Sequence, residues 1–208
     1  MIGIPHDQTG APHVEPDAPI GARWYAGTST CSGARVLLAV AHAAILVLGA
    51  GLVGEPADSV AAVLRSIDLN DATLAKRVVE LQRTAYQIEA DLIGFNGIPP
   101  LHETLDDVQT LPLYWRGSFE DHILAGIIGW TIVNDVCDID RLAVHPRFAR
   151  RGHGRQLVNS LIEQRTITAS TGTKNLPARQ LYESLGFIRT GEREIASDVT
   201  VTTYERSA

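Results

Sequence analysis

The spacing of apolar residues changes along the chain, and from about residue 64 onward it predicts a succession of helices and strands. A short strand is expected at 66–69, and apolar residues then recur at helical spacing as far as residue 92. This period is typical of one amphipathic helix, which the glycines and paired prolines of 94–101 end in a predicted loop. The residues that carry the helical period are Leu74, Val78, Leu81, Ala85, Ile88 and Leu92.

Three apolar segments follow this loop and are predicted to be consecutive strands, at 111–120, 122–133 and 136–144. Turn-forming pairs separate them, Glu120–Asp121 before the second strand and Asn134–Asp135 before the third. Short polar turns between such strands favour antiparallel pairing. The middle of the chain therefore predicts an antiparallel meander.

The last third of the chain predicts a change to parallel pairing. An amphipathic helix is expected over 155–165 and a strand over 166–171, so that a strand, a helix and a second strand follow one another. Such a unit pairs its two strands in parallel through a right-handed crossover. A second helix over 177–187 begins with proline and stops near a glycine, and a hairpin of 192–196 and 199–206 closes the chain.

The first 63 residues differ from the rest and are expected to form an irregular or helical extension to a single domain at 64–208. Pro, Gly, Ala and Thr dominate as far as residue 35, and an uncharged run then extends over 36–54, broken only by His42. This run is long enough to span a membrane, but its Ala and Gly content makes it weakly hydrophobic. We therefore favour a buried helix or a dispensable leader, with a membrane anchor as an open alternative.

Composition places the chain among globular proteins, since 45% of its residues are hydrophobic and 20% are charged. The net charge of −6 argues against general nucleic-acid binding and favours amine-bearing partners. Charge is nevertheless uneven: residues 141–155 hold five arginines, two histidines and no acid, and so carry +5, which leaves −11 on the remainder. Such a positive stretch in an acidic chain indicates a site for a small anion.

Cysteine and histidine usage predicts neither disulfides nor a metal site. Cys31 and Cys137 are too few for a disulfide scaffold and have no metal-ligand spacing. His102 opens the sequence HETLD, which lacks the second histidine of a zinc-binding helix. A reducing cytoplasm is the expected compartment.

The segment RRGHG, which starts at Arg150, lies between the end of a strand at Val144 and the start of a helix. Gly152 and Gly154 allow the backbone to turn its N–H groups toward one point, where the positive end of the helix also points. Arginine side chains can add charge-assisted hydrogen bonds at the rim. The segment therefore predicts a cradle for phosphate, although a solvated turn fits these residues too; the arginines concerned are Arg150, Arg151 and Arg155.

A longer stretch around this segment, DIDRLAVHPRFARRGHGRQLVNSLI, resembles the central motif of the GNAT superfamily of acyl-CoA N-acyltransferases. That motif is a Leu-x-Val strand, a proline, and Arg/Gln-x-x-Gly-x-Gly/Ala at the start of a helix. The chain departs from it at Ala149, where the family has Arg or Gln. The matching residues are Leu142, Val144, Pro146, Gly152 and Gly154.

A second block, NLPARQLYESLGF, resembles a further segment of the same family, Asn-x-x-Ala-x-x-x-Tyr-x-x-x-Gly-Phe. Together the two blocks are more specific than either alone, and the resemblance covers roughly residues 64 to 206. It implies a mixed α/β fold, with a mostly antiparallel sheet that has one parallel strand pair around the cofactor site and helices at its sides. The residues that match the second block are Asn175, Ala178, Tyr182, Gly186 and Phe187.

The resemblance implies that acetyl-CoA is the co-substrate. The backbone of residues 142–144 would pair with its pantetheine arm as an added strand, and the loop Arg150–Arg155 would hold its pyrophosphate. Tyr182 would protonate the departing thiolate, as a phenol that is protonated at neutral pH can do. The implied cofactor contacts are Leu142, Ala143, Val144, Arg150, Arg151, Gly152, His153, Gly154, Arg155 and Asn175.

Several of these residues have simpler interpretations when they are considered without the resemblance. Tyr182 lies among apolar residues and fits a core aromatic, and Asn175 fits a helix cap equally well. His153 fits a solvent-facing loop residue better than an acid or base.

The transfer requires an amine that has lost its proton, so a carboxylate is expected to act as a general base. Asp140 is the first candidate, because Asp138 and Asp140 alternate onto one face of a strand. Glu89, just before the predicted loop, is the second, directly or through a water. An aspartate beside Arg141 also fits simple charge balance.

The sequence thus predicts an acetyl-CoA-dependent N-acetyltransferase of the acyltransferase class, with a primary amine of a small molecule or a protein as acceptor. The open alternatives are a catalytically silent acyl-CoA-binding or sensor module and a membrane-tethered acetyltransferase. A homodimer is compatible with each of these functions. No nucleic-acid partner is expected, since the arginine stretch is short and lies in an acidic chain.

Overall fold

The computed structural model describes residues 42–44 and 62–208. The predicted extension at 1–63 and its uncharged run at 36–54 lie outside the described residues except for 42–44 and 62–63, so both stay predictions. Among the described residues, no helix combines the length and the apolar character that crossing a bilayer needs.

The strands form one sheet in the order β2-β3-β4-β5-β6-β8-β7, and β1 pairs with β5 beside this path. The meander β3-β4-β5 is antiparallel and β5 pairs with β6 in parallel, which confirms the predicted mostly antiparallel sheet with a parallel pair. A second parallel pairing, β1 with β5, was not predicted. The strands are β1 (His42–Ala44), β2 (Val63–Ser66), β3 (Tyr114–Glu120), β4 (Ile123–Val133), β5 (Val136–Val144), β6 (Thr166–Gly172), β7 (Ile188–Ala196) and β8 (Val199–Ser207).

The helices lie at the predicted places in the second half of the chain, but the helix predicted over 155–165 ends at Asn159, and the structure also differs near the prolines. The long helix α1 begins after Asp71, whose side chain accepts hydrogen bonds from the backbone of the first turn, and ends at Gly94 in the left-handed conformation. The predicted loop at 94–101 is wrong in part, because Pro99 opens a short helix. The helices are α1 (Ala72–Ile93), α2 (Pro99–His102), α3 (Leu105–Thr110), α4 (His153–Asn159) and α5 (Leu176–Ser184), with a short 3-10 turn at Pro146–Phe148.

The structure differs from the predicted elements at two further places. The strand predicted at 66–69 is wrong, since the strand is Val63–Ser66 and pairs with the middle of β3. The helix α3 was not predicted, although its start carries a capping box in which Thr104 and Asp107 each bond the other's backbone N–H.

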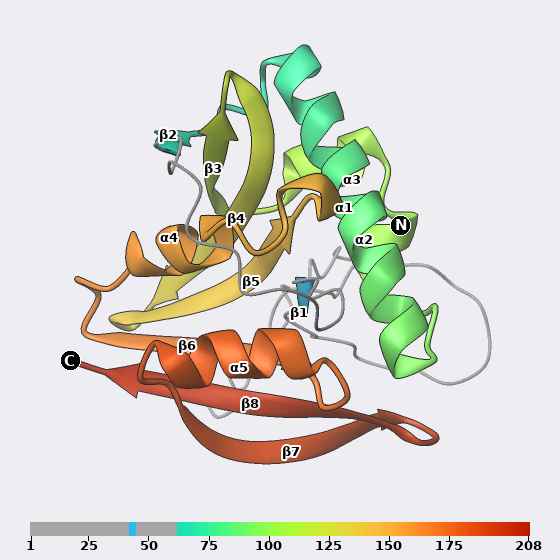
Figure 1. Cartoon of the computed structure of the whole chain (residues 1–208), viewed down its shortest axis with the longest axis vertical. Coiled ribbons are helices and arrows are strands. Elements are labelled where there is room, and N and C mark those ends of the chain that lie inside the picture. Colours follow the sequence, from blue (N-terminus) through green and yellow to red (C-terminus); the bar gives the residue numbers. More distant parts are fainter. Residues whose placement is uncertain (1–41, 45–61) are drawn as a thin grey trace, which may run out of the picture. The chain divides into compact units, whose positions relative to one another are not determined.

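The helices cover the two faces of the sheet, and each face has its own apolar core (Figure 1). On one face, α1 and α3 pack on residues that include Trp115 and Ile127. On the other face, α4 and α5 pack on neighbouring positions of the same strands, such as Ile128 and Leu142. The alternation of side chains along a strand therefore decides which helix layer a residue of β4 or β5 faces.

An extra residue in β5 separates that strand from β6. Gly129 of β4 faces Arg141 and the next residue, Trp130, faces Ile139, so Asp140 has no partner on β4. The pairing between β5 and β6 also stops at Ile139. A bulge of this kind bends a strand and ends regular pairing, which leaves the second half of β5 with a free edge toward β6. Part of that edge pairs with β1, at residues 141–143.

The side chain that anchors α4 to the sheet is Leu157, and its removal should destabilise the fold. Leu157 is fully buried, and its Cδ1 would lie only 3.1 Å from a Cβ built on Gly126. We expect Leu157→Ala to lower the free energy of unfolding by about 2–5 kcal/mol, because the cavity cannot be filled without moving the helix. Urea unfolding measures this, with the exposed Leu176→Ala as control. A loss of less than about 1 kcal/mol in the Leu157 variant would contradict the packing described.

Candidate active site

The loop between β5 and α4 presents backbone amides and arginines to solvent. Gly152 has φ +87° and forms the N-cap of α4 without a side-chain cap, and Arg150 is also left-handed at φ +64°. Within the part of the chain that the structure describes, the amides of 151–155 have no hydrogen-bond acceptor. Amides in such a turn suit an anion, because their partial positive charges point the same way.

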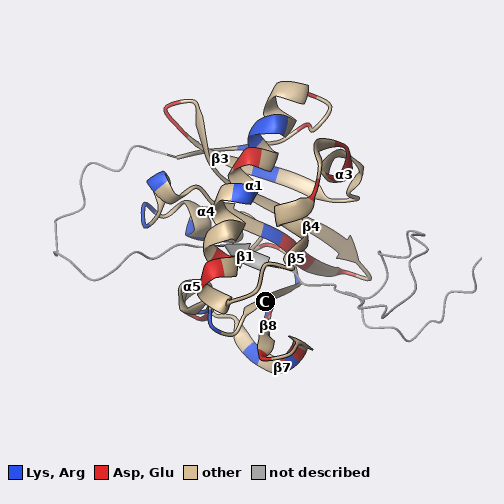
Figure 2. Cartoon of the chain, turned by 90° about the vertical axis from the view of Figure 1, so that its right-hand side faces the viewer, with Lys and Arg blue, Asp and Glu red and all other residues tan. Residues whose placement is uncertain are grey.

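Four of the five arginines of residues 141–155 are exposed around this loop. Figure 2 shows blue ribbon gathered beside α4. Two of these arginines are also anchored: the Arg151 guanidinium donates to Glu120 at 2.5 Å, and that of Arg155 donates to Ser184 at 2.8 Å. The exposed members are Arg147, Arg150, Arg151 and Arg155.

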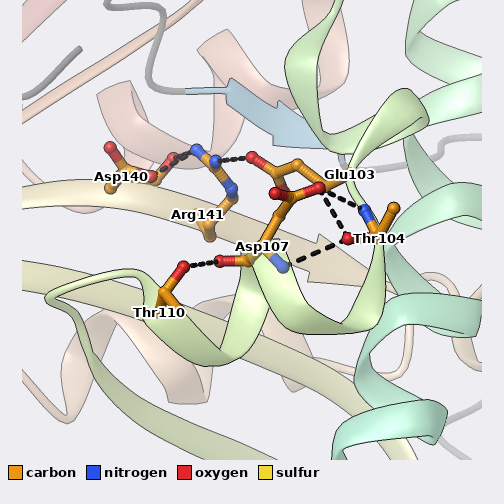
Figure 3. Close-up of polar contacts among 6 residues, drawn as sticks. All are labelled: Glu103, Thr104, Asp107, Thr110, Asp140 and Arg141. Carbon is orange, nitrogen blue, oxygen red and sulfur yellow. Dashed lines mark hydrogen bonds and ion pairs between the residues drawn. The ribbon is translucent and has the colours of Figure 1, made fainter. Parts of the chain in front are cut away.

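The fifth arginine, Arg141, is buried on the face that α1 covers and does not belong to this group. Its guanidinium donates to Glu103 at 2.7 Å and forms an ion pair with the carboxylate of Asp140. Figure 3 shows Arg141 between these two carboxylates, which come from the α2–α3 connection and from the bulge of β5. The positive stretch of the sequence is therefore divided between two places in the fold.

Glu89 of α1 is buried, and its carboxylate lies beside polar groups at the end of β6. Its carboxylate accepts weak hydrogen bonds from the Thr171 hydroxyl at 3.3 Å and the Gly172 N–H at 3.4 Å, and one from the Asn175 side chain. Burial raises the pKa of Glu89 to about 7, against the opposing effect of these hydrogen bonds. A carboxyl with this pKa is partly ionised at neutral pH, as a general base must be. Its second oxygen has no hydrogen-bond partner within residues 42–44 and 62–208.

Asn175, at the start of α5, and Tyr182, within that helix, lie close to this carboxyl. Asn175 caps the helix through its side-chain oxygen, which accepts from the Ala178 N–H at 3.2 Å, and its amide group reaches Glu89. The helix-cap interpretation of Asn175 is therefore confirmed. Tyr182 is 1% exposed and packs against Phe187 and Tyr204.

The electrostatics around Tyr182 favour the protonated phenol. Burial raises its pKa far above the ordinary value, and the nearby carboxylates of Glu89 and Asp138 raise it further. The side chain belongs to the same apolar core as Ile139 and Ala169, the last residues paired between β5 and β6. Tyr182 thus lies in the core that these two strand ends help to form.

The bulge changes the expected arrangement of Asp138 and Asp140. Their alternation onto one strand face assumed a regular strand, but the extra residue gives the two carboxylates different partners. Asp138 accepts a hydrogen bond of 2.5 Å from the Thr168 hydroxyl, and Asp140 is held by Arg141. Among the described residues, Glu89 forms no ion pair, and it lies beside both Asn175 and Tyr182.

His153 is buried, so its interpretation as a solvent-facing residue is wrong. Its two ring nitrogens bind Ser118 and Glu120 of β3, at 2.8 and 2.9 Å. Sequence reasoning missed these two partners and also missed Glu103. None of these three partners lies in a motif. The only local signal is His153 itself, a polar residue between Gly152 and Gly154 at the start of a helix that must pack on the sheet.

Comparison with known proteins matches part of this chain. The family model described as "FR47-like protein" matches residues 117–196. The UPF0157 protein YqkA of Bacillus subtilis is 35% identical over 121 residues, which are 56% of this chain and 35% of that protein. The chain therefore spans about a third of the length of this curated relative.

Solved structures share the fold at low sequence identity. The ribosomal-protein-S18-alanine N-acetyltransferase of Escherichia coli has a TM-score of 0.56 at 19% identity over 71% of this chain and 94% of that chain. The PaiA N-acetyltransferase of Thermoplasma acidophilum, in complex with coenzyme A, has a TM-score of 0.57 at 14% identity over 71% and 99%. A GNAT-family acetyltransferase of Streptococcus pneumoniae has 0.56 at 18% over 71% and 100%.

The buried state of Glu89 predicts a distinct pH dependence of stability. The folded protein holds this proton up to about pH 7, whereas an unfolded glutamate releases it near pH 4.5. Stability is therefore lost as the pH rises between these two values, by about 3 kcal/mol in total. Glu89→Gln carries no such proton, so the difference in unfolding free energy between variant and wild type should grow by this amount from about pH 4.5 to about pH 8. Urea unfolding across this range tests it, and a constant difference would show that Glu89 titrates normally.

Proposed function

We propose that the chain is a member of the GNAT superfamily and an N-acetyltransferase that transfers an acetyl group from acetyl-CoA to a primary amine, which its fold and its matched segment support. The observation that carries the proposal is the arrangement around the gap where β5 and β6 separate and β1 pairs with β5. Amides and arginines lie at one end of β5, and a buried carboxyl with a pKa of about 7 faces β6.

The coenzyme would enter along the free edge of β5. Its pantetheine amides would pair with the backbone of residues 142–144, and its diphosphate would lie against the amides of the loop Arg150–Arg155. The strand β1 pairs with residues 141–143 of the same edge. Binding of the coenzyme therefore requires β1 to leave this position, since one edge cannot pair with two partners.

The side of the gap under α1 suits an amine acceptor. The carboxylates of Glu103 and Asp140 bind Arg141, and the Arg83 guanidinium donates to the backbone carbonyl of Glu103 at 2.8 Å, while Glu89 adds a negative charge when it is ionised. Among the residues that the structure describes, one oxygen each of Glu89 and Glu103 is buried without a hydrogen-bond partner. Buried oxygens in this state accept donors readily, and an ammonium group supplies both the donors and the opposite charge.

The reaction then needs two protons to leave the nitrogen, one from the ammonium and one from the tetrahedral intermediate, and one proton to reach the sulfur. Glu89 would take a proton from the ammonium, and the free amine would attack the thioester carbonyl, with a backbone N–H near Val144 as donor to the oxyanion. The tetrahedral intermediate would expel the CoA thiolate. Tyr182 would donate its proton there, because its phenol stays protonated at neutral pH and lies in the core that the ends of the two strands help to form. The proton that leaves the intermediate would restore the phenol of Tyr182. Its burial requires the sulfur to come down into the gap.

Glu89 replaces Asp140 as the first candidate for the base. The carboxylate of Asp140 is already engaged in an ion pair with Arg141. Glu89 forms no ion pair among the described residues, and burial raises its pKa to about 7. Asp140 serves instead to hold Arg141 and the bulge.

The function is tested first by binding and then by turnover. We expect calorimetry to show that the full-length protein binds acetyl-CoA, and a thiol assay to detect CoA release with some members of a panel of small amines and peptides. Desulfo-CoA analogues without an acyl group serve as the control for adventitious thiols. Absence of affinity for CoA and its esters would overturn the proposal. Affinity without turnover across a broad panel would instead establish the silent acyl-CoA-binding module.

The two candidate bases are separated by their variants. Glu89→Gln should lower kcat/KM for the amine by roughly 10²-fold and remove the rise of the rate near pH 7, because a general base contributes on this scale. Asp140→Asn, the matched control, should keep that rise. Initial rates from about pH 5.5 to about pH 9 decide between them, and a profile that loses its inflection only in the Asp140 variant would reverse the assignment.

A further inference from the structure

A buried cluster beneath the loop joins α4 to β3, and the proposed chemistry does not use it. The Ser118 hydroxyl oxygen lies 2.8 Å from Nδ1 of His153, and Oε2 of Glu120 lies 2.9 Å from Nε2 of the same ring. The other oxygen of Glu120 accepts from Arg151 at 2.5 Å. One carboxylate therefore holds the residues on both sides of Gly152.

The order of serine, histidine and glutamate is that of a hydrolase triad, but the cluster cannot act as one. A nucleophile must reach its substrate, and the Ser118 side chain is fully buried. The imidazole is 2% exposed and has both nitrogens engaged within the cluster. These groups hold one another in place rather than react.

The hydrogen bonds also fix where the protons lie. Burial by itself raises the pKa of Glu120, but hydrogen bonds from His153 and Arg151 outweigh this and hold it below the ordinary value. The carboxylate is therefore ionised at neutral pH and accepts from both partners. Nε2 of His153 must then carry a hydrogen, and in the neutral ring Nδ1 accepts the hydrogen of the Ser118 hydroxyl.

The loop depends on these contacts for its shape. Two of its residues are left-handed, and the N-cap Gly152 contributes no side-chain bond. Arg151 is held from two directions, since its guanidinium also lies over the Phe148 ring at 5.4 Å. The same ring meets the edge of His153 at 5.8 Å. Without Glu120, Arg151 and His153 would keep only this aromatic contact in common.

We propose that Glu120 is a positioning residue for acyl-CoA, which ties the loop Arg150–Arg155 to β3 through Arg151 and His153 so that its amides and guanidiniums meet the diphosphate. This role rests on the proposed function. Glu120 does not touch the coenzyme, because its carboxylate is buried and both oxygens are engaged. The negative charge of Glu120 would by itself repel a nearby phosphate. Glu120 therefore favours binding by orienting the cations of the loop and not by attracting the ligand.

The test uses Glu120→Gln in the full-length chain, with Asp121→Asn as the matched control. Both variants remove one negative charge at adjacent positions, but Asp121 is exposed and its left-handed backbone accommodates asparagine. Glutamine offers one acceptor oxygen in place of two, so the bond to either Arg151 or His153 is lost. We expect KM for acetyl-CoA to rise about tenfold in the Glu120 variant, as for a lost charge-assisted hydrogen bond, while KM for the amine and kcat at saturation stay near wild type.

A second readout is independent of the coenzyme. Hydrogen exchange of the amides of 150–155 in the free protein should be faster in Glu120→Gln than in wild type and unchanged in Asp121→Asn. If the Glu120 variant does not fold, Ser118→Ala provides the same comparison, because it loosens His153 and removes no charge.

The outcomes separate the two proposals. Wild-type affinity for acetyl-CoA in Glu120→Gln overturns the positioning role, whether or not the loop exchanges faster. A uniform fall in kcat with an unchanged KM for acetyl-CoA also overturns it, since that pattern marks general destabilisation. If the wild type itself does not bind acetyl-CoA, the proposed function fails. The exchange data would then still report whether Glu120 holds the loop, but holding it for the coenzyme would no longer be its role.

Discussion

The separation of β5 from β6 is the constraint on which the rest of the site depends. A parallel pair of strands has no room for a ligand between them, because each backbone group is already bonded to its neighbour. The pairing with β6 ends at Ile139, next to the bulged Asp140, and the edge that follows pairs with β1 instead. The cost of the irregularity is offset locally, since Arg141 binds Asp140 and is itself held by Glu103. The bulge and the buried ion pairs therefore form one structural unit.

The bulge also divides the charges of the site. Before folding, Arg141 and the arginines of the loop form one positive stretch, but Arg141 lies on the face under α1 and the others surround the start of α4. This leaves a cationic end that suits a diphosphate, and on the other side carboxylate oxygens of Glu89 and Glu103 that suit an amine. The diphosphate of the coenzyme is negative and the ammonium of the acceptor is positive, so each would be drawn to its own side of the gap.

Much of the fold follows from local patterns. The apolar period of α1, the polar turns of the meander and the crossover through α4 were all sufficient to predict these elements, because each depends on residues close in sequence. The capping box of α3 is equally local and was overlooked. The bulge and the partners of His153 could not be predicted in this way. Whether Asp140 is inserted, and whether Ser118 and Glu120 face an imidazole, depends on the register between distant strands.

The contrast between Asp140 and Glu89 shows how the fold decides which carboxylate can be a base. The Arg141 guanidinium engages the carboxylate of Asp140 in an ion pair, so the residue that the sequence favoured is already bound to a cation. Glu89 forms no ion pair among the described residues, and the groups that bond it come from the end of β6 and from Asn175. Asn175 also caps α5, which carries Tyr182. The proposed base and the proposed acid are thus joined through one side chain, so the position of α5 bears on the hydrogen bonding of Glu89 as well as on the place of Tyr182.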